Sequence, residues 1–453
     1  MSRRADARRY LFVVWEGGGT IPPEMAIAKG LVDRGHEVRV LGDPCVEGDA
    51  LAAGCSFTPY RRAPHRLSRD PETDLLREWE AKGQLGSFLR ARDRLFFGPA
   101  YDFARDVLDT LERFPADVVC VDNMLFGGMV GAEKAGIPTA ILMPNIYTYP
   151  APGLPPLGPG FQPARGPLGR LRDAAYQRVS NRLLQAAFEY LNDARSRLGL
   201  VPLRTLHEQV ERVERILVLT SSGFDFKANK LPPNVRYVGP QLDDPSWVPE
   251  WRSPWPAFDP DPLVAVAFST TFQNQGRTLK RAIQALGSLP VRGFVTLGPS
   301  LDPSDFDAAR NVTVVPSAPH SAVFREASVV VTHAGHGTLM KALAAGVPVI
   351  CLPMGRDQND NAARVVAAGV GIRLSARALS RTMRNAVRRV LEDPSYRENA
   401  RRMAAAISLE TRRPLAVEEL EAMARRAASG KSAAKARRIR LRESRERELV
   451  SVR

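Results

Sequence analysis

The chain has 453 residues, more than one core of ordinary size accommodates, so two domains are expected. With 44% hydrophobic and 25% charged residues its composition is that of a globular protein, which excludes gross disorder outside the ends. The net charge is +15, but residues 425–453 hold eleven Lys or Arg against three Glu, and this concentration argues against a nucleic-acid-binding fold. We interpret that tail as a solvated extension, with weak contact to an anionic membrane surface as the alternative.

Cysteine usage and hydropathy point to the cytoplasm. The four cysteines show no C-x-x-C spacing and are expected to be buried thiols of a reducing compartment; they are Cys45, Cys55, Cys120 and Cys351. No stretch of 18 uninterrupted apolar residues occurs, and no apolar segment precedes a cleavage site near the N-terminus. We therefore expect a cytoplasmic protein, either a monomer or a homodimer.

Strand-like and helix-like stretches alternate along most of the chain, which predicts parallel α/β sheets. The apolar run at 10–15 is followed by a helical stretch at 22–35, where Pro22 and Pro23 suit a first turn and Gly35 suits a C-terminal cap. Further strands of this first series are expected at 37–43, 116–122, 137–144 and 215–222.

Two segments interrupt the alternation. Residues 150–167 are too rich in Pro and Gly for a helix, and we interpret them either as a surface loop or as the wall of an apolar pocket. Residues 239–261 contain six prolines and three tryptophans without periodicity, which is typical of a linker between domains. A second series of strands follows this linker, at 262–270, 293–298, 311–316, 327–335 and 347–353.

These patterns predict a division of the chain into five parts. We expect a basic extension at 1–9, a Rossmann-like domain at 10–238, the linker at 239–261, a second Rossmann-like domain at 262–424 and a basic tail at 425–453, disordered or helical. The last helix of the second domain is a candidate to return to the first. Open parallel sheets bind ligands at the carboxyl ends of their strands, so two such domains predict a cleft with two substrates.

A glycine triplet follows the first strand, in the stretch WEGGGT at 15–20. The triplet lacks the G-x-G-x-x-G spacing of a dinucleotide loop and the Lys-Ser/Thr of a phosphate loop. We interpret this stretch as the floor of the cleft, bare of side chains so that two substrates can meet there.

The second glycine turn, HAGHGT at 333–338, has the features of an anion site. Gly335, Gly337 and Thr338 open a helix directly after a strand, so free backbone amides and the positive end of the helix dipole converge there. His333 ends the strand and is placed to donate to the same oxygens. In the next loop, Asp357 and Gln358 have the donors and acceptors that fix sugar hydroxyls.

HAGHGT together with Pro353, Asp357, Gln358, Asn361 and Ala362 resembles the donor signature of family 1 glycosyltransferases, GT-B enzymes that include bacterial antibiotic and macrolide glycosyltransferases. The resemblance extends to RGHEV, VGPQL and VAFSTTF, and so spans the chain up to about residue 425. It implies an inverting transfer of a hexosyl or deoxyhexosyl group from a nucleoside diphosphate sugar to an acceptor, with no metal and no cofactor.

The resemblance also implies roles for single residues. The pyrophosphate would be held by His333, Gly335, Gly337, Thr338 and Thr270, and the sugar by Asp357 and Gln358. These assignments agree with the reasoning from the helix terminus. No D-x-D cluster that would require a metal occurs, and the leaving-group charge would be stabilised by the dipole and by hydrogen bonds.

The sequence departs from the family at the nucleoside. Lys341 stands where a glutamate of the family holds the ribose hydroxyls, and an ammonium does not replace a carboxylate in kind. Val314 and Ser317 stand in the segment where many members stack the base on a tryptophan. Base and ribose recognition are therefore not of the plant UDP type; the donor is a UDP- or dTDP-sugar, and loss of the glutamate would fit a 2'-deoxyribose.

The first glycine turn contains the other departure. The family's catalytic histidine corresponds here to Thr20, whose hydroxyl has no usable basicity, whereas its partner aspartate is present as Asp122. We expect Asp122 to act directly as the base, with Glu16 as the second candidate and His65 as the third. A phenol, another acidic acceptor or a carbon nucleophile would need less basic help.

Three functions are compatible with these residues. The first is a glycosyltransferase for a hydrophobic, natural-product-like small molecule of secondary metabolism. The second is a catalytically impaired protein that binds nucleotide sugars as a partner or regulator, for which Thr20 and Lys341 are the evidence. The third is a lipid glycosyltransferase docked on the inner membrane through the basic tail.

Overall fold

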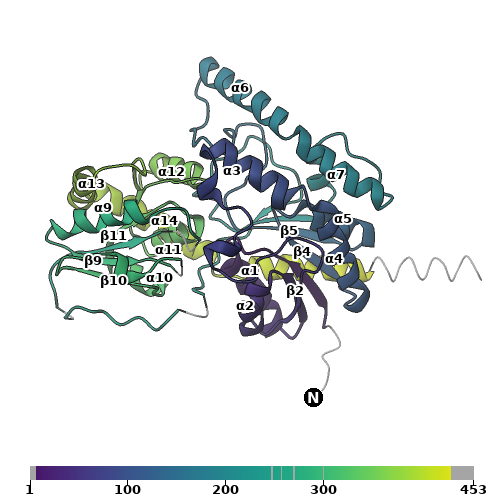
Figure 1. Cartoon of the computed structure of the whole chain (residues 1–453), viewed down its shortest axis with the longest axis horizontal. Coiled ribbons are helices and arrows are strands. Elements are labelled where there is room, and N and C mark those ends of the chain that lie inside the picture. Colours follow the sequence, from purple (N-terminus) through teal and green to yellow (C-terminus); the bar gives the residue numbers. More distant parts are fainter. Residues whose placement is uncertain (1–6, 246–247, 257, 269–270, 299, 430–453) are drawn as a thin grey trace, which may run out of the picture.

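The computed structural model describes residues 7–245, 248–256, 258–268, 271–298 and 300–429. Two parallel sheets lie side by side, each with helices on both faces (Figure 1). Thr270, expected at the pyrophosphate, and the basic tail from residue 430 onward fall outside the described residues. The predicted fold class, two Rossmann-like domains, is confirmed.

The first sheet has seven strands in the order β3-β2-β1-β4-β5-β6-β7. Their bounds are β1 Arg9–Val13, β2 Glu37–Gly42, β3 Ser56–Pro59, β4 Val118–Asp122, β5 Thr139–Met143, β6 Arg215–Val218 and β7 Val235–Tyr237. Successive residues of β1 point to opposite faces, and both faces are buried: Leu11 and Val13 belong to one core, Tyr10 and Phe12 to the other. This two-sided burial explains the unbroken apolar runs of the central strands.

Helices cover both faces of this sheet. The helices of this domain are α1 Ile21–Asp33, α2 Glu47–Ala52, α3 Gly83–Ala91, α4 Ala100–Arg113, α5 Phe126–Ala135, α6 Pro167–Leu183, α7 Gln185–Arg197 and α8 Leu206–Glu211; of these, α6 buries no residue and does not cover the sheet. Helix α1 begins with Pro22 and Pro23 in its first turn and ends before Gly35, whose φ of +88° is the left-handed conformation that glycine adopts without strain. The sequence analysis predicted this helix correctly.

The second sheet has six strands in the order β10-β9-β8-β11-β12-β13. Their bounds are β8 Leu263–Ala267, β9 Arg292–Thr296, β10 Val312–Val315, β11 Ala327–Thr332, β12 Val349–Cys351 and β13 Gly371–Arg373. The helices are α9 Gly276–Gly287, α10 His320–Glu326, α11 His336–Ala344, α12 Gln358–Ala367, α13 Ser380–Glu392 and α14 Pro394–Glu410. Three short strands, β3, β7 and β13, were not predicted, and all three lie at sheet edges.

Chain segments cross between the domains and fix their arrangement. Residues 415–429 are helical and contribute Val417, Leu420 and Met423 to a core of the first domain, against which this yellow helix lies in Figure 1. Arg364 of α12 forms a buried ion pair of 2.7 Å with Asp225, which follows β6. Removing one partner of such a pair costs about 3–5 kcal/mol, because the other charge is left buried.

The linker packs on the second domain. The indole of Trp251 lies edge-on to Phe294 of β9 with 4.8 Å between ring centroids, and its Nε1 donates to Glu326 at 2.6 Å.

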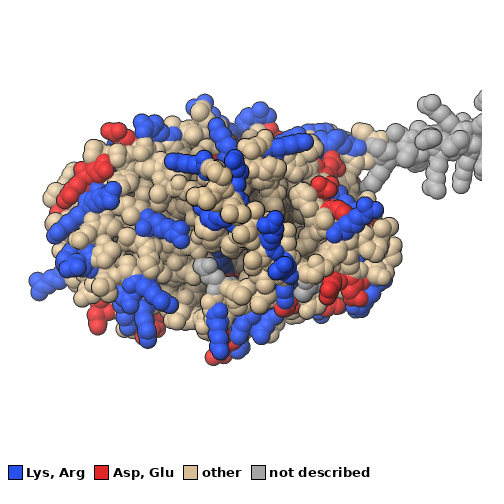
Figure 2. All heavy atoms as spheres, turned by 90° about the horizontal axis from the view of Figure 1, so that it is seen from above, with Lys and Arg blue, Asp and Glu red and all other residues tan. Residues whose placement is uncertain are grey.

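Lys and Arg side chains are spread over the face seen in Figure 2 and outnumber acidic ones there. Within the described part of the chain, no helix has both the length and the apolar character needed to span a bilayer.

Candidate active site at the facing strand ends

Each glycine turn lies at the point where the strand order of its sheet reverses. In the first sheet β1 lies between β2 and β4, so the chain after β1 leaves beside the end of β4, where Asp122 lies. In the second sheet β8 lies between β9 and β11, and the 333–338 turn follows β11. Ligands of open parallel sheets bind at such reversal points, so both turns are candidate ligand-binding sites.

The 333–338 turn presents a helix N-terminus. Gly335 is the N-cap of α11, and a Cβ atom added to Gly337 would meet no atom within 4 Å. Ala334 adopts a φ of +72°, which is strained for a residue with a Cβ, and its carbonyl accepts a hydrogen bond from Asn361 Nδ2 at 3.1 Å. The turn therefore has open space above amides whose dipole favours an anion.

His333 is almost fully buried beside this turn. A Cβ atom on Gly335 would overlap its ring, so glycine is required there for the ring to lie over the helix end. Burial, and next the charge of Arg356, lower the pKa of His333 to about 3. The ring is therefore neutral at physiological pH and acts as a single hydrogen-bond donor without a positive charge.

The loop after β12 contains the residues predicted to hold the sugar. Asp357 is the N-cap of α12 and accepts from Asn361 Nδ2 at 2.5 Å. Gln358 is only 2% exposed: its Oε1 accepts from the backbone N of Met354 at 2.7 Å, and its Nε2 donates to Gln273 at 3.0 Å. Asp357 thus lies at the loop surface, whereas Gln358 holds the loop itself in shape.

At the predicted nucleoside region, Lys341 is not alone. Its Nζ lies 2.6 Å from Oδ1 of Asp244, a linker residue whose other oxygen accepts from the backbone N of Ser321 at 3.1 Å. Although burial opposes it, the ammonium holds the pKa of Asp244 below its usual range. A carboxylate thus lies beside the position of the missing glutamate. Val314 lies in β10 and Ser317 directly after it, both half-buried.

The 15–20 turn is compact. Gly18 adopts a φ of +81°, and a Cβ atom on Gly17 would lie 2.9 Å from both Thr20 Oγ1 and the Trp15 ring. Thr20 is the N-cap residue of α1 and its hydroxyl lies 3.5 Å from the Trp15 carbonyl. A Cβ atom on Gly19 would meet nothing within 4 Å. The turn is thus tightly packed below and open at Gly19.

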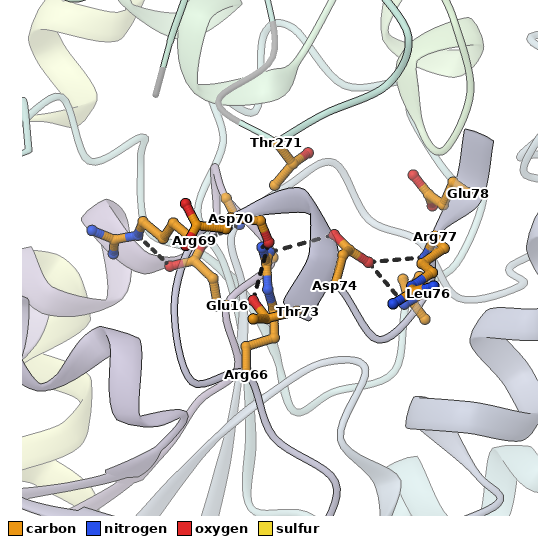
Figure 3. A network of polar contacts seen from close by, with 12 residues as sticks. Glu16, Arg66, Arg69, Asp70, Thr73, Asp74, Leu76, Arg77, Glu78 and Thr271 are labelled. Carbon is orange, nitrogen blue, oxygen red and sulfur yellow. Dashed lines mark hydrogen bonds and ion pairs between the residues drawn. The ribbon is translucent and has the colours of Figure 1, made fainter. Parts of the chain in front are cut away.

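Glu16 holds this turn in place. Its Oε1 accepts from the backbone N of Gly18 at 2.7 Å, and its Oε2 forms an ion pair of 2.9 Å with Arg69 (Figure 3). Arg69 also pairs with Asp49 at 2.6 Å. A carboxylate neutralised in this way is poorly suited to act as a base.

Asp122 is completely buried at the end of β4, where burial raises its pKa to about 6. Its Oδ1 accepts from the backbone N of Met124 at 2.8 Å. Its neighbour is Glu24 of α1, also completely buried, whose pKa is raised well above its usual range by burial and then by Asp122. Apart from this pair and the adjacent Trp15 indole, Glu24 and the Asp122 Oδ2 have no partner within the described residues. Burial thus favours the protonated form of both carboxyl groups, and more strongly that of Glu24.

Glu24 was not among the residues predicted from the sequence. Glu24 lies one helical turn after Thr20, and a glutamate on the apolar face of a helix was the signal that could have revealed it. His65, the third base candidate, lies elsewhere: its Nδ1 is 2.9 Å from the Ala63 carbonyl, on the loop after β3.

The Pro/Gly-rich segment 150–167 reaches the second domain. Asp360 of α12 accepts from the backbone N atoms of Gly158 at 2.7 Å and Gly160 at 3.2 Å. Asn359 Nδ2 donates to the Gly158 carbonyl at 3.2 Å. The segment therefore packs against α12, the helix that follows the loop predicted to hold the sugar, as a wall of this region would.

A second segment of the first domain, residues 66–80, crosses toward the donor side; we name it the strap. Asp43 ties the strap to the glycine turn, because it accepts from the backbone N atoms of both Arg66 at 2.7 Å and Glu16 at 2.6 Å. Asp74 accepts from the backbone N of Arg77 at 3.0 Å and lies 3.4 Å from the Arg66 guanidinium (Figure 3). The strap is thus a folded polar structure rather than a loose loop.

Comparison with known proteins identifies the family. The sequence profile described as UDP-glucoronosyl and UDP-glucosyl transferase matches residues 103–417. The chain belongs to this family. It is a glycosyltransferase, and its sugar comes from a nucleoside diphosphate.

Single relatives cover nearly the whole chain. The chain is 32% identical over 403 residues to 4'-demethylrebeccamycin synthase of Lentzea aerocolonigenes, covering 87% of this chain and 94% of that relative. Among solved structures, it is similar to the calicheamicin glycosyltransferase CalG4, with a TM-score of 0.72 at 22% identity over 92% of this chain and 98% of that one. It is also similar to the spinosyn rhamnosyltransferase SpnG complexed with thymidine diphosphate, with a TM-score of 0.64 at 20% identity over 88% of this chain and 96% of that one. These structural likenesses confirm the GT-B fold.

Proposed function

We propose that this glycosyltransferase transfers a hexosyl or deoxyhexosyl group from a nucleoside diphosphate sugar to a hydrophobic small-molecule acceptor, with inversion and without a metal. One observation carries the proposal: across the domain boundary, the 15–20 glycine turn contacts the loop that contains Asp357. Arg356, the residue before Asp357, donates from Nη1 to the Gly17 carbonyl at 3.1 Å. Donor and acceptor would therefore approach each other at this contact.

On the donor side, His333 and the amides at the start of α11 bind the diphosphate, and Asp357 binds hydroxyls of the sugar. The dipole of α11 and the neutral His333 ring stabilise the charge that develops on the leaving diphosphate, so the residues present suffice without a metal ion. Asp244 and Lys341 together border the ribose. A thymidine diphosphate in the structurally similar SpnG supports a thymidine or uridine diphosphate here.

On the acceptor side, Asp122 takes the acceptor proton. As the proton moves to Asp122, the acceptor oxygen or nitrogen bonds to C1 of the sugar from one face, and the C1–O bond to the diphosphate breaks on the other face. The anomeric configuration is thereby inverted. Burial raises the pKa of Asp122 to about 6, and a protonated Glu24 beside it would donate a hydrogen bond that favours the Asp122 carboxylate, so that the pair would carry a single negative charge.

The kinship with 4'-demethylrebeccamycin synthase supports an aromatic or otherwise apolar acceptor. The test is incubation of the protein with dTDP- and UDP-sugars and a panel of phenols, indoles and macrolides, with release of nucleoside diphosphate and product mass as readouts. We expect product with at least one pair, unchanged rates in EDTA, and the opposite anomeric configuration in product and donor. Tight binding of nucleoside diphosphate without turnover on any pair would instead favour the impaired binding protein.

A further inference from the structure

Arg356 is held in an unusual position at the end of the loop after β12. Its φ of +52° lies in the left-handed region, which a residue with a long side chain adopts only when its surroundings hold it there. Its guanidinium crosses the domain boundary and contacts the Gly17 carbonyl and the Glu78 carboxylate, the latter at 2.9 Å. One side chain thus touches the acceptor turn, the donor loop and the strap.

The strap closes on the second domain around this ion pair. Next to Glu78, the indole of Trp79 lies edge-on to Phe272 with 5.0 Å between ring centroids. Gln273 Nε2 lies 3.5 Å from the same Glu78 oxygen, Oε2, and Gln273 also binds Gln358 of the donor loop. Glu78 is therefore placed against the two loops that follow β8 and β12, at the end of the strap opposite Glu16 (Figure 3).

Strained backbone gathers at this boundary. Among the described residues, the non-glycine residues with positive φ are Arg77, Asn274, Ala334 and Arg356. They come from the strap, the loop after β8, the donor turn and the donor loop. Backbone strain of this kind persists at sites where a particular geometry is needed for binding or switching.

The charge of Arg356 reaches the anion site. Asn361 Nδ2 donates to both the Ala334 carbonyl at 3.1 Å and the Asp357 carboxylate at 2.5 Å, so the loop that contains Arg356 lies against the 333–338 turn. In keeping with this arrangement, the charge of Arg356 contributes to lowering the pKa of His333. A largely buried guanidinium is costly without a counterion, and Glu78 is that counterion in the structure. A diphosphate at the start of α11 would bring more negative charge to the same place than one carboxylate supplies.

We propose that Arg356 binds the donor diphosphate directly, and that the Glu78 carboxylate occupies the place of the diphosphate beside Arg356 when no donor is bound. This inference rests on the proposed function. A guanidinium has five N–H donors in a planar fork, so Arg356 can turn from Glu78 to phosphate oxygens while it keeps the Gly17 carbonyl. Donor binding would then release Glu78 and with it the end of the strap, while the acceptor turn stays attached to the occupied donor site.

The test measures dTDP and UDP binding by calorimetry to the full chain and three variants. Arg356→Gln should weaken binding by about tenfold or more, because a charge-assisted contact is lost. Glu78→Gln should tighten binding about threefold, because the competing anion is removed. Glu80→Gln is the matched control, since Glu80 lies on the same strap and pairs instead with Arg90 at 2.9 Å; it should leave binding unchanged.

Hydrogen exchange of residues 76–80 gives a second readout. In the wild-type protein dTDP should speed exchange there, whereas in Glu78→Gln exchange should be fast already and insensitive to dTDP. If Glu78→Gln weakens binding as much as Arg356→Gln does, the pair is only a brace between domains and the inference is overturned. Absence of nucleoside diphosphate binding to the wild type would overturn the proposed function as well, whereas normal binding and transfer with the wrong Glu78 response overturns this inference alone.

Discussion

The two glycine turns of this glycosyltransferase are held in shape by different kinds of contact. The 333–338 turn is built from neighbours in sequence: a strand end, two glycines and the amides of one helix. The 15–20 turn is held by residues from distant parts of the chain, namely Asp43, Arg69, Asp122 and Arg356. A site built from residues close in sequence can be predicted from a short motif. A site built from residues far apart in sequence is seen only in the folded structure.

The largest effect is expected at the acceptor turn. Asp122→Asn should lower the transfer rate by about 10²–10⁴-fold, the range of general-base catalysis, because the amide accepts no proton. Binding of nucleoside diphosphate should be unchanged, since Asp122 lies in the other sheet. The measurement is kcat beside calorimetric affinity.

Glu16→Gln is the contrasting variant, and we expect a smaller loss because Glu16 acts only by holding the turn.

The wild-type rate should rise as pH increases through about 6, where Asp122 ionises, and reach a plateau above it. Near-normal transfer by Asp122→Asn would remove Asp122 from the role of base.

A substitution at the 333–338 turn, in contrast, should impair use of the donor. His333→Ala should lower kcat/KM for the donor by about 10²–10³-fold, the effect of losing one donor to a developing oxyanion. Binding of nucleoside diphosphate should weaken along with it. The measurements are donor kinetics and calorimetry, and an unchanged donor KM and kcat would show that the ring only fills space over Gly335.

A matched pair of glycine variants compares the turns directly. Neither Gly337→Ala nor Gly19→Ala places a Cβ within 4 Å of another atom, so both variants should fold normally. Gly337→Ala should weaken nucleoside diphosphate binding several-fold, by crowding the anion site. Gly19→Ala should leave that binding intact and raise the acceptor KM instead. Equal effects of both variants on both ligands would contradict a division of labour between the turns.

The smallest effect concerns stability. The folded-state pKa of Glu24 is raised, so the folded protein retains a proton that the unfolded chain loses as pH increases, and stability falls with rising pH across that window. Glu24→Gln removes this loss. The variant should therefore gain stability relative to the wild type more at pH 8 than at pH 5, as measured by denaturant unfolding. If the difference in stability between the two proteins does not change with pH, folding does not change the pKa of Glu24.

Much of the fold follows from patterns within short windows. The central strands, buried on both faces, have long apolar runs, and the sequence analysis predicted them. The strands that were missed, β3, β7 and β13, lie at sheet edges and have only three or four residues, too few for an alternating pattern to be recognised. The same limit applies to the nucleoside region, where Asp244 reaches Lys341 across 97 positions of the chain.

By itself, the sequence determined the two parallel sheets, the family and the glycine turn at the start of a helix, because apolar periodicity, glycine and helix termini act over a few residues. Only the tertiary structure decided the surroundings of each carboxylate: Glu16 forms an ion pair with Arg69, whereas Asp122 is buried beside Glu24. It also placed Arg356 against Gly17 and Glu78. Charges act through space over distances that chain separation does not reveal, so their partners are set by the packing of the two domains.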